Sequence, residues 1–315
     1  MEYLLRVENS GNERENASKE GKTNEFEEFE NEWKNVQNDL KQQMIEIDNV
    51  DFEIPFTTSD ETEEDKIDIE EVDDDDDEKE EQTTTTATTT TSTAAASTTP
   101  NKSNKLRYVG GVDISFVKDN MEDACASIVI LKYPSLKVVY EIYEFVKLTL
   151  PYIPGFLAFR ECPSLIPLIE RIKTERPELF PQVLLVDGNG MLHTRGFGLA
   201  CHLGVLADLP TIGVGKTFFC VDGMSSKQVK LDVAKHCKSA GDYLPLQGES
   251  GKIWGAAVIS HSNSTNAIFI SQGHRLSLDS SLKIIRACTT TNRVPEPVRQ
   301  ADLRSRDFIR KNYKP

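Results

Sequence analysis

Residues 182–216 read QVLLVDGNGMLHTRGFGLACHLGVLADLPTIGVGK, an apolar run that ends abruptly in Asp187 between small, flexible residues. The four apolar residues before Asp187 predict a strand that is buried on both of its faces. Asp187 is then expected where this strand reaches the carboxyl edge of a sheet. Active sites of α/β sheets gather at that edge, so this segment predicts a site that includes Asp187.

The flanking segments predict the rest of the sheet. Runs rich in β-branched and aromatic residues indicate strands at 108–117, 124–133, 136–148, 211–214, 252–260 and 267–273. Apolar spacing and composition indicate helices at 156–174, 198–206, 277–288 and 299–312. The first three strands follow one another with short polar breaks, which favours an antiparallel meander. Helices and strands alternate after it. We therefore expect an α/β fold with a mixed central sheet flanked by helices.

The first third of the chain differs sharply in charge from the remainder. Residues 1–103 carry 31 acidic and 9 basic side chains, and residues 104–315 carry 20 acidic and 27 basic ones. The net charge of −15 thus hides a basic body of +7. Such a body attracts polyanions, although a charge of this size also fits an ordinary soluble protein.

Two tracts of biased composition precede the basic body. Of the 23 residues 59–81, 16 are Asp or Glu, and residues 82–100 include 11 threonines. Neither tract can bury a core, so we expect both to be disordered. A solvated spacer is the common interpretation of such tracts. An acidic tract that shields the basic body is the alternative hypothesis.

Upstream of these tracts, Trp33, Val36, Leu40 and Met44 follow helical spacing and predict a helix that docks on the body. The predicted organisation is a disordered tail at 1–24, a docking helix at 25–57, a disordered insertion at 58–103 and an α/β domain at 104–315. The insertion would then be a long surface loop, which loop-closure entropy tolerates. A separate helical tail is the alternative.

Cysteine usage and hydropathy indicate the compartment. The six cysteines lie far apart and form no C-x-x-C pair, so we interpret them as buried free thiols. No apolar run approaches the ~20 residues of a membrane span, and the N-terminus is too polar for a secretory signal. We expect a monomer without membrane contact in a reducing compartment: the cytoplasm, with the nucleus or nucleolus as further locations.

Two more carboxylates join Asp187 as candidates for a metal site. Asp113 interrupts the first strand, and Glu161 follows an apolar helix start, PGFLAFRE. A lone strand aspartate such as Asp113 is more often a paired surface residue than a metal ligand. Together, the three offer the oxygen ligands that hard cations such as Mg²⁺ take, with open positions for substrate phosphates.

Groups suited to phosphate or bases lie near Asp187 in the sequence. Lys216 follows a glycine turn, and His193 and Arg195 follow the glycine loop with Gly188 and Gly190. Glycines after a strand are most often turn residues, but they also admit the close approach of a flat ligand.

Residues 151–155 read PYIPG, in which Pro151 and Pro154 stiffen a turn that holds Tyr152 and Ile153. A rigid aromatic tip can wedge into a nucleic-acid stack, although a tyrosine beside proline is more often packed. His274 closes the last predicted strand and could reach the same sheet edge as a ligand. His202 and His236 are interpreted as structural.

Several motifs in order resemble those of the endonuclease V family, in its eukaryotic branch. They are YVGGVDISF, PYIPGFLAFRE, VDGNGMLHTRGFGLACHLGV with PTIGVGK, and SQGHRLSL with PEPVRQAD. The resemblance runs from about Trp33 to Tyr313 and leaves out the biased tracts. One departure is Thr194, because many members have proline after the histidine. This difference bears on the orientation of the His193 side chain.

The resemblance implies a ribonuclease H-like fold and a Mg²⁺-dependent endonuclease that recognises inosine and cuts one nucleotide beyond it on the 3′ side. Mn²⁺ is expected to substitute for Mg²⁺. Eukaryotic members prefer RNA, so inosine-containing single-stranded RNA is the expected substrate, with deaminated DNA as a further one.

Carried over by motif, Asp113, Glu161 and Asp187 would bind the metal, and Tyr152 would form the wedge. His193 and Lys216 would lie near the scissile phosphate and His274 near the metal. Leu157, Gly188 and Gly190 would line the hypoxanthine pocket. The rival hypotheses are a non-catalytic inosine-RNA binder, a DNA repair endonuclease for deaminated bases, and a related nuclease for branched or hybrid substrates.

Overall fold

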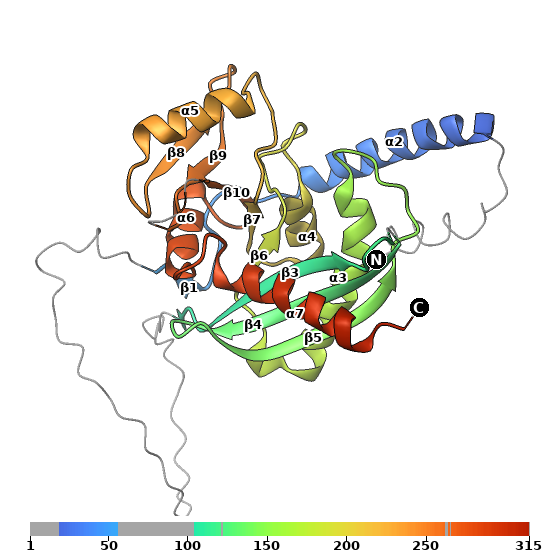
Figure 1. Ribbon diagram of the computed structural model, residues 1–315, viewed down its shortest axis with the longest axis horizontal. Helices are drawn as coiled ribbons and strands as arrows, with labels where there is room; N and C mark the ends of the chain where they lie inside the picture. The colour runs from blue at the N-terminus through green and yellow to red at the C-terminus, as the bar shows by residue number, and fades with distance from the viewer. Residues whose placement is uncertain (1–18, 56–103, 121, 262–263, 265, 315) are drawn as a thin grey trace, which may run out of the picture.

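The computed structural model describes residues 19–55, 104–120, 122–261, 264 and 266–314. The predicted tail up to residue 18 and the predicted insertion, 58–103, lie outside the described residues. The described chain forms an eight-stranded sheet with helices on both sides (Figure 1). The α/β architecture with a mixed sheet is therefore confirmed. Every helix in the described ranges is too short or too polar to cross a membrane.

The sheet has the strand order β5-β4-β3-β6-β7-β10-β9-β8. Its strands are β3 (Tyr108–Phe116), β4 (Asp123–Lys132), β5 (Lys137–Lys147), β6 (Val183–Asp187), β7 (Thr211–Gly215), β8 (Tyr243–Gln247), β9 (Ile253–Val258) and β10 (Ile268–His274). β3, β4 and β5 form the predicted antiparallel meander. β6 and β7 add to β3 in parallel, and the last three strands are antiparallel. The carboxyl ends of β3, β6 and β7 consequently meet at one edge of the sheet.

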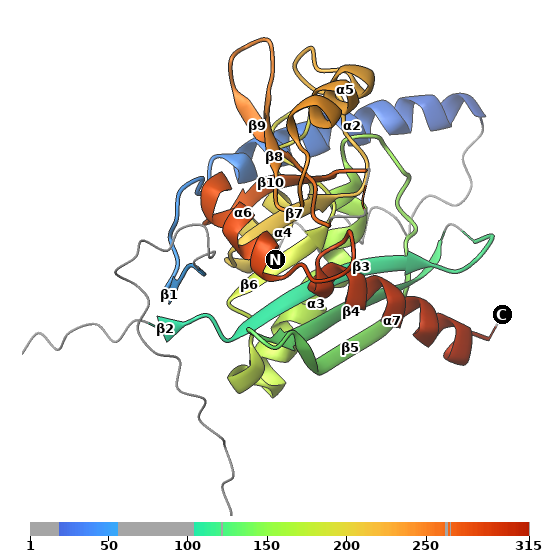
Figure 2. The same cartoon turned by 60° about the vertical axis from the view of Figure 1, so that its left-hand side comes forward.

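Helices cover both faces of this sheet (Figure 2). They are α2 (Lys19–Lys41), α3 (Leu157–Glu175), α4 (Leu199–Ala207), α5 (Ser226–His236), α6 (Leu278–Ala287) and α7 (Glu296–Asn312), with a 3-10 turn η1 (Pro177–Leu179). A short parallel pair, β1 (Phe52–Glu53) and β2 (Asn104–Lys105), aligns Phe52 with Asn104. The chain therefore leaves for the insertion and returns from it at neighbouring points.

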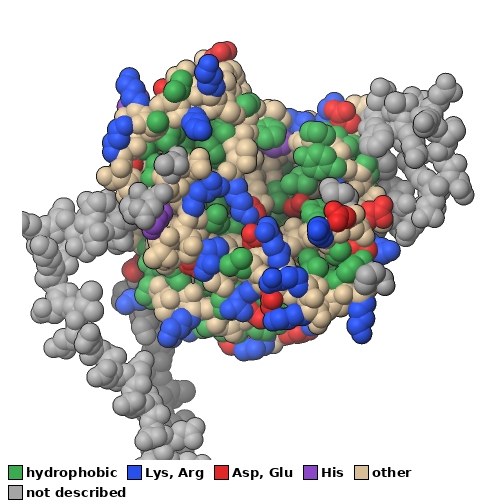
Figure 3. Space-filling model, in the orientation of Figure 1, with side chains coloured by type: hydrophobic (Ala, Val, Ile, Leu, Met, Phe, Trp, Pro, Cys, Tyr) green, Lys and Arg blue, Asp and Glu red, His purple; other side chains and the backbone are tan. Residues whose placement is uncertain are grey.

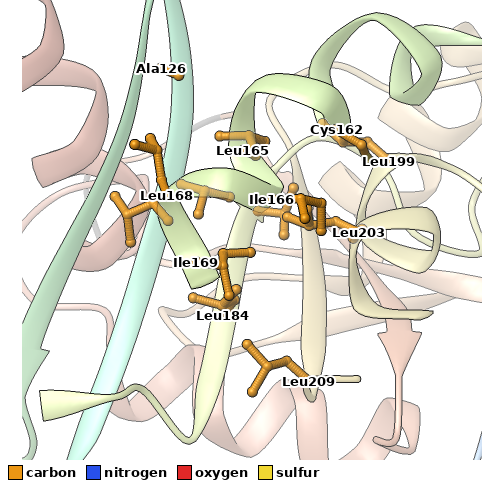
Figure 4. Close-up of a cluster of buried hydrophobic side chains, with 14 of the residues drawn as sticks. Ala126, Cys162, Leu165, Ile166, Leu168, Ile169, Leu184, Leu199, Leu203 and Leu209 are labelled. Carbon is orange, nitrogen blue, oxygen red and sulfur yellow. The ribbon is translucent and has the colours of Figure 1, made fainter. Parts of the chain in front are cut away.

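Alternate residues of the central strands face different helices, as the two-residue period of a strand requires. Ile128 and Ile130 of β4 pack with α3 and α4 in the largest apolar cluster, part of which Figure 4 shows. Val129 and Leu131 pack instead against α7. Each fully buried side chain of this kind stabilises the fold by about 1.5–3 kcal/mol. This packing holds α3 and α7 on opposite faces of β4, the strand next to β3, which carries Asp113.

Helix α2 docks on the α3 and α4 side of the domain. Trp33 is 1% exposed, and its ring stacks on Phe159 at 4.9 Å between centroids. Leu40 and Met44 pack on a small cluster that includes Phe197. The helix begins at Lys19, six residues before the predicted start, and ends before Met44. The apolar face predicted from residues 33–44 is thus the face that contacts the body.

Besides the short elements β1, β2 and η1, the sequence analysis missed two longer elements, α5 and β8, because their apolar signal is weak. In α5 only Val229 and Val233 are buried. β8 is an edge strand of the sheet with Leu246 as its one buried residue, and it contains Pro245. Both elements pack together at the far end of the sheet, beside β9.

Candidate active site

The register of the parallel strands brings Asp113 and Asp187 side by side. Val112 of β3 pairs with Val186 of β6, so the two aspartates are the next opposed positions at the carboxyl edge. Neighbouring strands lie about 4.8 Å apart, and opposed side chains point to the same face. Two carboxylates are therefore adjacent at the edge that the apolar run predicted.

Hydroxyl groups from two elements hold Asp113. Ser115 Oγ donates to Asp113 Oδ2 at 2.7 Å, and Ser305 Oγ of α7 donates to the same oxygen at 3.1 Å. The close packing of α7 on β3 depends on the absence of a side chain at Gly111. A Cβ at this position would lie 2.0 Å from the carbonyl oxygen of Pro297, which is too close for two atoms that are not bonded. The start of α7 is thereby pressed against the strand that carries Asp113.

Glu161 reaches the same place from α3. Its side chain is buried, and its pKa is raised to about 8 by burial and by the negative charges of Asp113 and Asp187. Burial and Asp187 likewise raise the pKa of Asp113 to about 7. Mutual repulsion of this kind shows that the three carboxylates share one electrostatic environment.

Lys216 and Asp302 complete the group. Lys216 Nζ donates to Asp187 Oδ2 at 2.5 Å and lies 3.7 Å from Asp302 Oδ2 on α7. Burial lowers the pKa of Lys216, but its hydrogen bond to Asp187 and the nearby carboxylates outweigh burial and raise it. Asp302 also adds to the repulsion on Asp113. We call Asp113, Glu161, Asp187 and Asp302 the carboxylate cluster.

The donor chemistry of the carboxylate cluster fits a hard divalent cation. Three of the four carboxylates, those of Asp113, Asp187 and Asp302, interact with the single ammonium of Lys216. The pKa values of Asp113 and Glu161 are raised by burial and by repulsion from neighbouring carboxylates, and a cation would relieve that repulsion. Even so, no group of three Asp, Glu, His or Cys side chains in the described ranges is already arranged to hold a metal. In the structure Ser115 and Ser305 donate to Asp113 Oδ2, and Lys216 donates to Asp187 Oδ2. A cation would have to compete with Lys216.

A cavity of about 170 Å³, here called the base cavity, lies beside the carboxylate cluster. Its walls come from α2, from residues 152–158, from the loop after β6 and from Phe219, and they include Tyr152, Leu157, Gly188 and His193. Asn189 also lines it, and its Oδ1 is buried without a hydrogen-bond partner among the described residues. Mostly apolar walls with a few polar groups suit a flat heterocycle.

The proline-rich turn presents Tyr152 at the mouth of this cavity. Tyr152 is 61% exposed, which is unusual for a large aromatic side chain. Pro151 is half-buried, Pro154 is exposed, and Ile153 packs beneath the turn on the cluster of Trp33. The turn therefore has an apolar anchor and an exposed aromatic tip.

Arg195 ties this turn to α2. Its guanidinium donates to the Gly155 carbonyl at 2.6 Å and to Gln37 Oε1, and lies 3.8 Å over the Phe156 ring. Gln37 in turn donates to the Phe197 carbonyl at 2.7 Å. The sequence analysis placed Arg195 among the substrate-binding residues. In the structure two of its donors, on Nε and Nη2, contact protein groups that shape the base cavity.

His193 lies in the wall of the base cavity. Its ring stacks on Phe219 at 5.5 Å, and its Nδ1 accepts a hydrogen bond from the Arg195 N–H. Burial and the charge of Arg195 lower the pKa of His193 to about 4. The imidazole is therefore neutral at neutral pH. In this position it is suited to contact a base and does not offer a positive charge to a phosphate.

Two predicted site residues are not part of this site. His274 pairs with Thr211 at the start of β7, roughly 10 Å along the sheet from the Asp187 edge. There its Nδ1 accepts from the Ile45 N–H, and Nε2 faces Asp208. Gly190 does not line the base cavity; a Cβ there would meet the Gln272 carbonyl at 1.9 Å. Its role is close packing of the loop.

The sequence analysis missed Asp302 and Asn189. The motif PEPVRQAD ends in Asp302 and was noticed for its resemblance, which was the available signal for this residue. Asn189 lies between the two glycines that were assigned to the pocket, but no periodicity or charge distinguished it.

The chain is similar to known proteins over most of this domain. Residues 90–303 match the family model described as Endonuclease V. Human endonuclease V is 51% identical over 207 residues, which span 66% of this chain and 73% of the human protein. The mouse protein is 51% identical over 206 residues, but these span only 61% of its length.

Solved structures give the same result. The catalytic domain of human endonuclease V superposes with a TM-score of 0.73 at 40% identity, covering 90% of this chain and 97% of that one. Endonuclease V of Ciona intestinalis, in complex with a 23mer DNA containing an inosine followed by a ribo-adenosine, gives 0.69 at 31% identity, covering 90% and 98%. The predicted ribonuclease H-like fold is confirmed by this likeness.

Proposed function

This chain belongs to the endonuclease V family of endonucleases, and on this premise we propose that it hydrolyses inosine-containing single-stranded RNA with Mg²⁺. The family is metal-dependent, and Mn²⁺ is proposed as a substitute. The proposed cut is the second phosphodiester 3′ to the inosine, which leaves a 5′-phosphate and a 3′-hydroxyl. The observation that carries the proposal is the carboxylate cluster of four side chains beside a base-sized cavity.

Asp113, Glu161 and Asp187 are the proposed metal-holding residues, with Asp302 as a fourth carboxylate from α7. Bound Mg²⁺ would supply a Lewis acid that neutralises negative charge on the phosphate. Ser305, which reaches Asp113 from α7, orients that carboxylate. Burial of Asp113 and Glu161 keeps competing water away from their oxygens.

Lys216 is the residue that contacts the phosphate in this proposal. Its ammonium has three donors, of which one is directed at Asp187. The remaining donors can hold a phosphate oxygen and orient the attacking water. Because the nearby carboxylates raise its pKa, Lys216 keeps its positive charge at neutral pH.

Base selection follows from the polar groups of the base cavity. Asn189 lines the base cavity, and its Oδ1, buried beside Gly215, has no hydrogen-bond partner among the described residues. A buried acceptor without a partner costs about 1–3 kcal/mol, so we propose that Asn189 turns this oxygen toward a base that offers a donor. Hypoxanthine carries a proton on N1, whereas adenine has an acceptor there. Tyr152 is proposed to fill the space left in the stack when the base enters the cavity, and a single-stranded substrate reduces the unstacking cost.

RNA is favoured over DNA by a feature of a relative. The strand bound to the Ciona intestinalis protein has a ribonucleotide directly after its inosine. We therefore propose that this chain needs a ribose at that position. A DNA strand with one ribonucleotide after the inosine should be cut like RNA, and the all-DNA strand should be cut far more slowly.

The cluster is tested by Asp187→Asn and Asp302→Asn, with Asp307→Asn as the matched control on α7, where Asp307 is exposed and pairs with Arg310. We expect both cluster variants to lose at least about a hundredfold in kcat on inosine RNA, since each removes a charge from the metal site. The control should cleave normally, and all three should melt as folded proteins. Full activity of Asp187→Asn would refute the assignment.

The non-catalytic binder is separated by the same assay. A non-catalytic binder would bind inosine RNA but give no cleavage product in Mg²⁺. In that case the wild type would be as inactive in the assay as Asp187→Asn.

A further inference from the structure

A second cavity, of about 250 Å³, is lined by Lys216 and shares none of its described lining residues with the base cavity. Lys216, Lys230 of α5 and Arg293 of the loop between α6 and α7 lie on its walls. Its floor is apolar and includes Phe218 and Phe269. Among the described residues that line it there is no Asp or Glu. We call it the basic cavity.

The basic cavity is coupled directly to the reaction centre. Arg293 Nη2 donates to the Lys216 carbonyl at 3.1 Å, while the ammonium of Lys216 contacts Asp187. Phe218 and Phe219 are consecutive, yet Phe218 lines the basic cavity and Phe219 lines the base cavity. One short segment after β7 therefore contributes to the walls of both cavities, and it starts at Lys216, which contacts Asp187 of the carboxylate cluster.

Charge distinguishes the basic cavity from its neighbour at α5. A neighbouring face of α5, which shares Val229 with the basic cavity, borders a cavity whose lining includes Asp222, Asp232 and Glu249. A polyanion would be repelled there and attracted to the side of Lys230. Figure 3, drawn in the orientation of Figure 1, shows Lys and Arg side chains gathered on the face toward the viewer, between the part of the molecule that contains α5 and helix α7.

From this arrangement we propose that the basic cavity binds the nucleotide on the 3′ side of the scissile bond, with Lys230 and Arg293 contacting the next backbone phosphate. The inference rests on the proposed function, because the direction of the strand follows from a cut 3′ to the base held in the base cavity. Cationic side chains over an apolar floor are the pattern of a single-strand subsite that reads backbone and not sequence.

Strand length provides the test. Two labelled inosine RNAs share their 5′ part: the long one continues for several nucleotides beyond the cut, and the short one ends at the first nucleotide beyond it. The short strand lacks the phosphate that Lys230 and Arg293 would contact. We expect the wild type to cleave the long strand about tenfold more efficiently in kcat/KM, as loss of a charge-assisted contact predicts.

Lys230→Ala should lower kcat/KM on the long strand toward the short-strand value and leave the short strand unchanged. Arg293→Lys, which keeps the charge near the Lys216 carbonyl, should have a smaller effect of the same kind. Lys235→Ala is the matched control, because this lysine lies on α5 but not on the cavity wall. Equal long-to-short ratios in wild type and Lys230→Ala would overturn the proposal.

A binding measurement in EDTA separates this proposal from the proposed function. Lys230→Ala should weaken affinity for the long strand about tenfold and lower the salt slope of log K by roughly 0.7, the value for one lost phosphate contact on a single strand. If the wild type cuts neither strand, the proposed function fails, and the EDTA result still decides whether the cavity binds the strand. An unchanged affinity and salt slope would count against the basic cavity alone.

Discussion

Binding of a divalent cation at the carboxylate cluster should release protons. The pKa of Asp113 is raised to about 7 and that of Glu161 to about 8, mainly by burial and by neighbouring carboxylates. With these pKa values both groups carry part of their protons at pH 7, so a cation that needs both ionised should expel about one to two protons. Raised carboxylate pKa values weaken binding at low pH. Affinity should therefore increase as pH rises from about 6 to 8 and level off above.

Isothermal titration calorimetry of Mg²⁺ into the protein, in two pH 7 buffers of different ionisation enthalpy, measures this proton release. Glu161→Gln should reduce it to about half a proton, because only Asp113 then titrates. Asp307→Asn, on the exposed side of α7, should not change it. Measurable binding with no proton exchange at pH 7 would refute the claim that the cation meets these two buried carboxylates.

Further predictions concern the wedge, the base cavity, buried histidines and the docked helix. Tyr152→Ala should weaken binding more on duplex than on single-stranded inosine substrates, and equal losses would argue against a wedge. Asn189→Ala should reduce the preference for inosine over adenosine about tenfold in competition binding; an unchanged preference would exclude its oxygen from base selection. Burial lowers the pKa of His193 to about 4 and that of His202 to about 3. The folded state therefore binds a proton at each histidine less readily than the unfolded chain, and protonation of either histidine destabilises the fold. Because the raised pKa values of Asp113 and Glu161 change the wild-type profile in the opposite direction, the comparison is with His202→Gln: in urea unfolding the stability difference between wild type and this variant should change by ~1 kcal/mol per pH unit as pH drops from about 6 to 4, and a constant difference would contradict the shift. Trp33→Ala should cost about 3–5 kcal/mol of unfolding free energy, and a loss below 1 kcal/mol would mean that α2 is not firmly docked.

The sequence predicted the sheet and its edge well because the signals there are local. An uninterrupted apolar run ending in Asp187 indicates a buried strand and its exit, and β6 is that strand. The same holds for the meander and for most helices. The polar helix α5 gave no comparable signal, since two buried valines do not define a face.

The errors within the site come from strand direction and from distance along the chain. His274 was placed at the Asp187 edge because it ends a strand, but β10 runs antiparallel to β7, so its end lies at the opposite edge. Asp302 resembles a solvated charge on a polar helix, and only the packing of α7 on β3 brings it to Lys216. Neither fact can be obtained from local periodicity.

The central claim is tested most directly by mapping the cut in matched oligonucleotides with one central inosine. The strands are all RNA, all DNA, and DNA with a single ribonucleotide after the inosine, each compared with its adenosine counterpart in Mg²⁺ and in EDTA. We predict cleavage of the inosine RNA and the chimeric strand at the second phosphodiester 3′ to the inosine, only in Mg²⁺. Cleavage at another bond, cleavage of the adenosine strands at the same rate, or product in EDTA would contradict the account.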